Sequence, residues 1–353
     1  MGRVRLAALL GALLSFSAIA QEGLLEISLY EGDLSKAKGL SVGPWGSGSV
    51  EEVDDVNFRG HSVLLIYTEG LYAGGRLEWS PPKDVRGILA DKFGYLRMAV
   101  KVPRKEALPG VPVGPEAPGF PGMPGMPGFE GVPPFGMPLQ MMLGQVWPGM
   151  PPWPPGGREF PGMPRPTRLE RRPPREIEAL RILIQAEGGW LALPYLDLEA
   201  FESGPEGWLE LDIPLKRFSK VGEIRPESKL RRLLIFGDAE GEIYVGRIAL
   251  ARDASPIRLT ALAEIGGRIS TEVDCLVGDT VVFTAEVEGG LATVEVRWDF
   301  DASDGVGIDA TGLRVEHAFE KPGDYVVTAV AVDPDGVKGE ARATLKVHVH
   351  PAE

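Results

Sequence analysis

A proline- and glycine-rich stretch, residues 107–175, limits what this chain can fold into more than any other feature. It holds 20 of the 32 prolines, 13 of the 46 glycines and seven of the nine methionines. Its apolar residues repeat neither every second residue, as in a strand, nor every 3.6 residues, as in a helix. Ordering a backbone of this length would cost about 70–140 kcal/mol, at roughly 1–2 kcal/mol per residue, and no apolar face offsets that cost. The stretch therefore predicts a disordered insertion with polyproline II character.

The first twenty residues have the pattern of a secretory signal peptide. Arg3 and Arg5 precede an apolar run, residues 6–20, that is too short to span a membrane, and Ala18 and Ala20 are the small residues that signal peptidase prefers. The pattern predicts removal of residues 1–20 and a mature chain without a membrane span. It places the protein in the periplasm, at the cell surface or in the medium.

The net charge limits the classes of partner that the chain can bind, and the cysteine content limits what can stabilise its fold. The formal net charge is −13, so the chain repels nucleic acid and anionic lipid, and we expect neither as a partner. The single cysteine, Cys275, cannot form an internal disulfide. Stability must therefore come from apolar cores.

Strand-like segments lie on both sides of the proline-rich stretch. Residues 95–102 alternate between apolar and polar side chains before it, and residues 208–214 do so after it. Residues 179–186 also have the composition of a strand. The four strands expected before it or the five expected after it would make a poor sandwich alone, with exposed edges. Together they suit one sandwich, and closing the loop between them costs only about 4 kcal/mol. We therefore predict one β domain over residues 21–255, interrupted by a disordered insertion at 107–175.

The order of apolar segments in this region resembles a known class of modules. The segments that carry the resemblance are residues 58–65, 72–75, 95–102, 207–218 and 243–248. They are similar to the jelly-roll, galactose-binding-like modules of secreted carbohydrate-active proteins. The resemblance implies a carbohydrate-binding β-sandwich. Such modules often carry acidic residues on their last strand, where this chain has Gly246 and Arg247.

The C-terminal region resembles the PKD (polycystic kidney disease) domain. The matching segments are residues 296–301, 317–319, 321–328 and 332–336. The resemblance implies an immunoglobulin-like sandwich, which we place at residues 264–353. Alternation in this region predicts that Trp298 and Phe300 enter the core while Asp299 and Asp301 point away from it.

One strand suggests a saccharide site. Leu209, Leu211 and Ile213 share one face of this strand, so its other face carries an aromatic ring and two carboxylates, which suits a pyranose ring and its hydroxyls. The alternative is that another part of the chain covers this second face. The predicted ligand-binding residues are Trp208, Glu210 and Asp212, with Trp190, Tyr195 and Trp79 extending the platform.

A group of aspartates suggests calcium. Asp299, Asp301, Asp304 and Asp309 lie close together, but their spacing is one residue off that of an EF-hand loop, and Ala310 stands where the loop needs a glutamate. The alternative is an acidic turn without metal. No cofactor other than calcium is expected.

Signatures of catalysis are missing from the sequence. None of the four histidines lies in an HExxH motif, and there is no Gly-x-Ser-x-Gly elbow. We therefore expect no enzyme but a secreted binding or adhesion protein, with a polysaccharide or glycoprotein as ligand. One alternative is a structural scaffold at the cell surface that binds a protein partner through residues 107–175. Another is a glycosidase, which would need two facing carboxylates.

Overall fold

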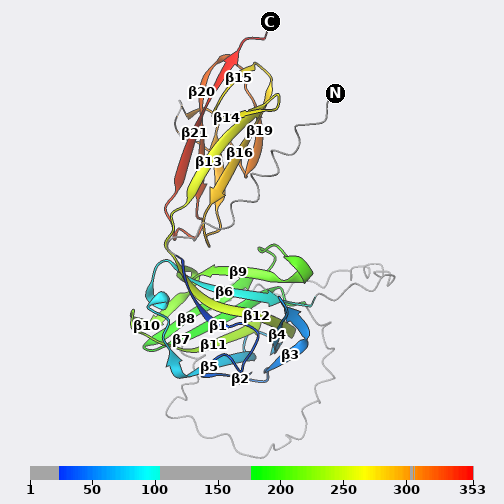
Figure 1. Cartoon of the computed structure of the whole chain (residues 1–353), viewed down its shortest axis with the longest axis vertical. Helices are drawn as coiled ribbons and strands as arrows, with labels where there is room; N and C mark the ends of the chain where they lie inside the picture. The colour runs from blue at the N-terminus through cyan, green and yellow to red at the C-terminus, as the bar shows by residue number, and fades with distance from the viewer. Residues whose placement is uncertain (1–23, 104–175, 303–304, 306, 353) are drawn as a thin grey trace, which may run out of the picture. The chain divides into compact units, whose positions relative to one another are not determined.

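The computed structural model describes residues 24–103, 176–302, 305 and 307–352. These residues form β-strands and three short 3-10 helices, at Ile88–Ala90, Pro205–Gly207 and Leu215–Arg217, which confirms the all-β prediction (Figure 1). The predicted signal peptide and the predicted insertion lie outside the described residues. Within them, no helix is long and apolar enough to cross a membrane.

Two six-stranded sheets make the first sandwich. The first sheet has the order β3-β4-β12-β6-β9, with β1 paired to β12. Its strands are β1 (Leu24–Tyr30), β3 (Ser49–Phe58), β4 (His61–Glu69), β6 (Gly94–Lys101), β9 (Leu209–Pro214) and β12 (Glu240–Asp253).

The second sheet has the order β10-β8-β7-β11-β5-β2. Its strands are β2 (Leu40–Trp45), β5 (Gly74–Lys83), β7 (Ala179–Ala186), β8 (Gly189–Asp197), β10 (Ser219–Gly222) and β11 (Leu230–Gly237). All pairs in both sheets are antiparallel.

Each sheet contains strands from before and from after the proline-rich stretch. In the first sheet β6 lies between β9 and β12, and in the second β11 lies between β5 and β7. Neither half could close its sheet edges without the other. This confirms that the stretch is an insertion within one jelly-roll sandwich and does not separate two domains.

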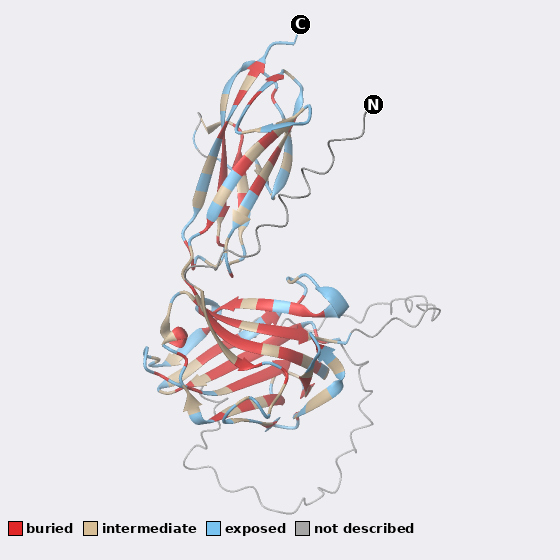
Figure 2. Cartoon of the chain, viewed as in Figure 1, coloured by how far each residue is buried: buried red, intermediate tan, exposed pale blue. Residues whose placement is uncertain are grey.

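The core of this sandwich follows the predicted alternation. Leu209, Leu211 and Ile213 of β9 are buried among residues of both sheets, and so are Leu233 and Ile235 of β11. Figure 2 shows the buried residues running along the strands of both sheets. Each sheet therefore has one face in the core and one outer face.

The C-terminal strands form a second sandwich with its own core. One sheet has the order β14-β13-β16-β19 and the other β15-β21-β20-β17-β18. The strands are β13 (Arg258–Ile265), β14 (Arg268–Ser270), β15 (Glu272–Leu276), β16 (Thr280–Glu288), β17 (Glu295–Asp299), β18 (Ala310–Thr311), β19 (Arg314–Ala318), β20 (Gly323–Val332) and β21 (Ala341–His350).

Trp298 occupies the centre of the second core. It is 0% exposed, its ring centroid lies 5.7 Å from that of Phe283, and its indole Nε1 donates a hydrogen bond of 2.8 Å to the carbonyl of Gly312. Phe300 is also buried, so the prediction for both aromatic residues is confirmed. Asp299 is buried as well, contrary to simple alternation, because its carboxylate accepts hydrogen bonds from backbone amides.

A buried ion pair ties the end of β12 to the turn after β20. Lys338 Nζ lies 2.6 Å from Asp253 Oδ2, and both side chains are 1% exposed. The same ammonium donates to the Ser255 hydroxyl and to the carbonyl of Gly289, while Asp253 also accepts from the amide of Leu291. Every donor of the lysine is thus used.

Candidate functional site

The predicted saccharide platform on β9 is covered. Trp208, which immediately precedes the strand, is 4% exposed, and its ring centroid lies 4.9 Å from that of Phe58 at the end of β3. The two rings pack with Val63 and Ala99 in a small apolar cluster on the outer face of the first sheet. The expectation of an open aromatic surface at Trp208 is therefore wrong, because the β3–β4 turn lies over it.

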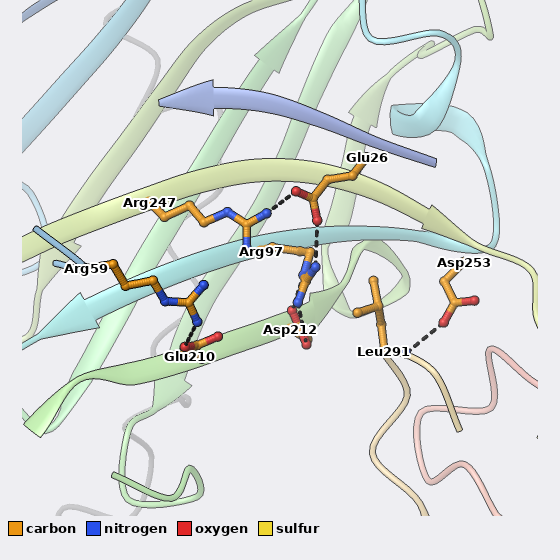
Figure 3. Close-up of polar contacts among 8 residues, drawn as sticks. All are labelled: Glu26, Arg59, Arg97, Glu210, Asp212, Arg247, Asp253 and Leu291. Carbon is orange, nitrogen blue, oxygen red and sulfur yellow. Dashed lines mark hydrogen bonds and ion pairs between the residues drawn. The ribbon is translucent and has the colours of Figure 1, made fainter. Parts of the chain in front are cut away.

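The two carboxylates predicted beside Trp208 are already paired. Glu210 Oε1 lies 2.5 Å from a guanidinium nitrogen of Arg59, and Asp212 lies 2.6 Å from Arg97 Nε. Arg97 also lies 2.6 Å from Glu26, which in turn contacts Arg247. These contacts link four charged residues, from Arg247 to Asp212, and the Arg59–Glu210 pair stands apart from them (Figure 3).

Electrostatics agree with this pairing. Burial opposes the charge on Arg97, but hydrogen bonds and charge from Asp212 and Glu26 outweigh it and raise the pKa of the guanidinium. The two carboxylates thus hold a cation of the chain itself. This face offers a ligand few unpaired polar groups.

The other predicted ligand-binding residues lie elsewhere. Trp79 of β5 is 3% exposed and belongs to the core between the sheets. Trp190 and Tyr195 lie on β8, in the second sheet; Trp190 is half-buried and Tyr195 is 56% exposed. The six residues therefore do not form one platform. Only Trp190 and Tyr195 remain on an accessible surface.

The outer face of the second sheet combines aromatic and polar side chains. The strand register aligns one residue from each strand in a row across it. From β2 to β10 this row contains Ser41, Glu78, Arg232, Gln185, Trp190 and Val221. Planar amide and guanidinium groups thus lie in line with an indole ring, which is a combination found in saccharide sites.

A shallow hollow of about 470 Å³ lies at the Trp190 end of this row. Among the described residues, Gln185, Trp190 and Arg231 line it, together with one carboxylate, that of Glu187. The carboxylate lies 3.5 Å from Arg231, whose side chain is 53% exposed.

Glycine backbone forms the edge of the hollow. Gly188 and Gly222 face one another with φ angles of +89° and +84°, and a Cβ atom on either would collide with backbone of the opposite turn. Any residue with a side chain is therefore excluded at Gly188 and Gly222. The ring of Trp190 stands beside this low edge.

Arg181 of β7 lies farther along the same face. It is 5% exposed, and its guanidinium lies 5.1 Å from the centroid of the Tyr72 ring and 5.9 Å from that of Phe236. One of its nitrogens donates to the carbonyl of Leu71 at 3.0 Å. Burial lowers the pKa of Arg181. The arginine fixes Tyr72, itself 61% exposed, at the edge of the face.

Sequence reasoning missed Tyr72, Arg181, Gln185 and Arg232 as members of this face. The spacing of residues 179–186 does place Arg181 and Gln185 opposite Leu180, Ile182 and Ile184, so part of the signal was present. What alternation cannot show is that β7 lies between β8 and β11, which brings these side chains beside Trp190.

The four aspartates predicted to bind calcium do not converge in the described part of the chain. Asp299 accepts hydrogen bonds from the amides of Asp301 and Gly307, and Asp309 accepts one from the amide of Phe300. Asp304 lies outside the described residues. Among the residues that the structure does describe, no group of three or more histidine, cysteine or acidic side chains is placed to hold a metal ion. The aspartates that are described shape the loop after β17.

Comparison with known proteins identifies the C-terminal sandwich. The PKD domain family matches residues 273–349, so this part of the chain is a PKD domain. No curated protein sequence matches the chain.

The solved structures that resemble the chain are distant. A β-1,2-glucanase from Parabacteroides distasonis has 14% identity and a TM-score of 0.31, over 92% of this chain and 38% of that one. The four N-terminal Ig domains of Dscam1 isoform 1.9 have 14% identity and a TM-score of 0.22, over 49% and 37%. The extracellular domain of a putative hybrid two-component system from B. thetaiotaomicron has 12% identity and a TM-score of 0.21, over 46% and 29%. The chain spans less than two-fifths of the length of each, and similarities this distant assign no function.

Proposed function

We propose that this protein is an extracellular, non-catalytic binding protein that holds a polysaccharide on the outer face of the second sheet, at Trp190. The observation that carries the proposal is the contrast between the two outer faces of the jelly-roll sandwich. On the first, Trp208 is covered and the neighbouring acids are paired. On the second, Trp190 lines a hollow together with Gln185 and Arg231.

The chemistry of the hollow suits a saccharide. An indole ring covers the apolar C–H face of a pyranose, and amide and guanidinium groups exchange hydrogen bonds with its hydroxyls. The surface is shallow, so it fits a segment of a polymer better than an enclosed small molecule. Affinity for one ring is expected to be modest, because the hydroxyl groups lose water on binding.

The same hollow supports a role without catalysis. Hydrolysis of a glycosidic bond commonly requires two carboxyl groups on either side of the scissile bond. Glu187 is the one carboxylate among the described residues that line the hollow, and Arg231 lies beside it. The signal-like N-terminus and the PKD domain support a place outside the cytoplasm.

The test is affinity electrophoresis of the mature chain through gels containing xylan, galactomannan, β-glucan or polygalacturonate. We expect at least one of these polymers to retard the wild type. Trp190→Ala should abolish that retardation, and Trp190→Phe should keep part of it because a smaller ring still stacks. The matched control is Tyr67→Ala, a half-buried aromatic residue of the first sheet.

Circular dichroism of each variant separates loss of binding from loss of folding. Retardation that persists in folded Trp190→Ala, or that Tyr67→Ala removes equally, would refute the proposed site. A wild type that no polysaccharide retards would refute the proposed function. If Trp190→Ala does not fold, the folded Trp190→Phe variant is compared with the wild type instead. Equal retardation of these two proteins would then refute the proposed site.

A further inference from the structure

Two arginines of the second sheet, Arg231 and Arg76, have longer ion-pair contacts than the paired arginines of the first sheet. Arg231 lies 3.5 Å from its nearest carboxylate partner, Glu187, and Arg76 lies 3.7 Å from Glu78. On the other sheet, Arg59 and Arg97 lie 2.5 and 2.6 Å from theirs. A guanidinium has five N–H donors, so Arg231 and Arg76 keep donors that their long contacts do not use.

Arg76 has unused N–H donors because its partner, Glu78, also contacts Arg232. Glu78 Oε1 accepts hydrogen bonds of 2.8 and 2.6 Å from two nitrogens of Arg232. That carboxylate is therefore committed to Arg232, and Arg76 shares it only at longer range. The side chain of Arg76 is 36% exposed and lies over Gly43, which has no side chain to compete with it.

These groups are spaced across the sheet. Trp190 lies on β8, Arg231 on β11 and Arg76 on β5, and the strands follow one another in the order β8-β7-β11-β5. Three strand spacings of about 4.8 Å place β8 and β5 about 14 Å apart. A single sugar ring is too short to reach from Trp190 to Arg76, whereas an oligosaccharide lying across the strands can do so.

We propose that the ligand of this face is an acidic polysaccharide, a polyuronate, with one ring on Trp190 and carboxylates of other rings on Arg231 and Arg76. This inference rests on the proposed function and adds the class of saccharide. A guanidinium matches a carboxylate through two parallel hydrogen bonds, a geometry that neutral hydroxyls cannot reproduce. The formal charge of the chain is −13, so a polyanion can be held only where the surface concentrates cations.

The test compares polygalacturonate with its methyl ester, which has the same backbone without the negative charges. We expect the wild type to bind polygalacturonate, to bind the ester at least tenfold more weakly, and to lose affinity for the acid form as NaCl is raised from 50 to 500 mM. Arg231→Gln and Arg76→Gln should each weaken binding of the acid form by about tenfold, as expected for loss of a charge-assisted hydrogen bond.

The matched control is Arg342→Gln in the PKD domain. Arg342 is 54% exposed and pairs with Glu340, much as Arg231 is 53% exposed and pairs with Glu187. Its substitution should leave binding unchanged.

The outcomes separate this inference from the proposed function. Equal binding of the acid and its ester, or binding of neutral polysaccharides alone, would overturn the polyuronate assignment and leave the saccharide site at Trp190 intact. An Arg342→Gln variant that weakens binding as much as Arg231→Gln would overturn the role of the two arginines. Binding to no polysaccharide at all would overturn both proposals.

Discussion

Replacing Lys338 by methionine should destabilise the protein by about 3 kcal/mol. Methionine matches much of the length of lysine but removes the ammonium, which leaves the Asp253 carboxylate at 1% exposure without its counter-charge. Removal of one partner from a buried ion pair typically costs about 3–5 kcal/mol. The lower end applies here because Asp253 keeps a hydrogen bond of 3.0 Å from the amide of Ser255. It also keeps one of 2.7 Å from the amide of Leu291 (Figure 3).

The pH dependence of this loss has a definite sign. Burial opposes ionisation of Asp253, but the hydrogen bonds from Lys338 and Ser255 outweigh it and hold the pKa of the carboxyl below its ordinary value. Such a group stabilises the fold above its unfolded-state pKa, and that contribution is lost as the pH falls through the folded-state pKa. The difference between wild type and Lys338→Met should therefore be largest near neutral pH and should shrink in acid.

Urea denaturation at pH 7 and at about pH 3, below the ordinary pKa of an aspartate, measures both effects. The double variant Asp253→Asn/Lys338→Met serves as the control, because removing both charges should recover part of the stability that Lys338→Met loses. A loss below about 1 kcal/mol for Lys338→Met at pH 7, or a loss that grows as the pH falls, would refute the reasoning.

Three further predictions concern stability and titration. Trp298→Ala should lower the free energy of unfolding by about 3–5 kcal/mol, because it empties the centre of the second core. A loss below about 1 kcal/mol in a urea titration would contradict this. Trp208→Ala should also cost about 3 kcal/mol, because it removes the ring that packs on Phe58; an unchanged unfolding midpoint would show that Trp208 has no packing role. In an NMR titration, His348 should show a pKa above its ordinary value, because Asp324 and Glu272 accept hydrogen bonds from its ring. His317 should instead show a lowered pKa, because it is partly buried. The stabilisation at His348 is present in acid and is lost as the pH rises through the raised pKa; Asp324→Asn should lower that pKa, and an unchanged value would count against the pairing.

Much of the fold could be predicted from the sequence because alternation is a local signal. The pattern at residues 95–102 and 208–214 identified β6 and β9, and the core positions of β9 followed directly. The aromatic residues of the PKD domain were placed in its core for the same reason. The need to cover sheet edges then predicted one sandwich from strands on both sides of the proline-rich stretch.

The site could not be predicted in the same way, because it depends on contacts between distant segments. Trp208 is covered by Phe58, which lies 150 residues earlier, and Arg97 reaches Asp212 across 115 residues. Alternation shows which face a side chain takes, but it does not show what lies over that face. The second-sheet face has the same difficulty: Gln185 and Trp190 are neighbours only because β7 and β8 pair in one particular register.

The most direct test of a saccharide site at Trp190 is an NMR titration that follows the indole N–H signals of the seven tryptophans. The ligands are oligogalacturonides and, as neutral counterparts, cello-oligosaccharides, and Trp190→Phe assigns the signal of Trp190. We predict that the Trp190 signal shifts and saturates on addition of ligand, while the signals of buried Trp208 and Trp298 stay in place. A saturating shift of the Trp208 signal with none at Trp190 would contradict the proposed site.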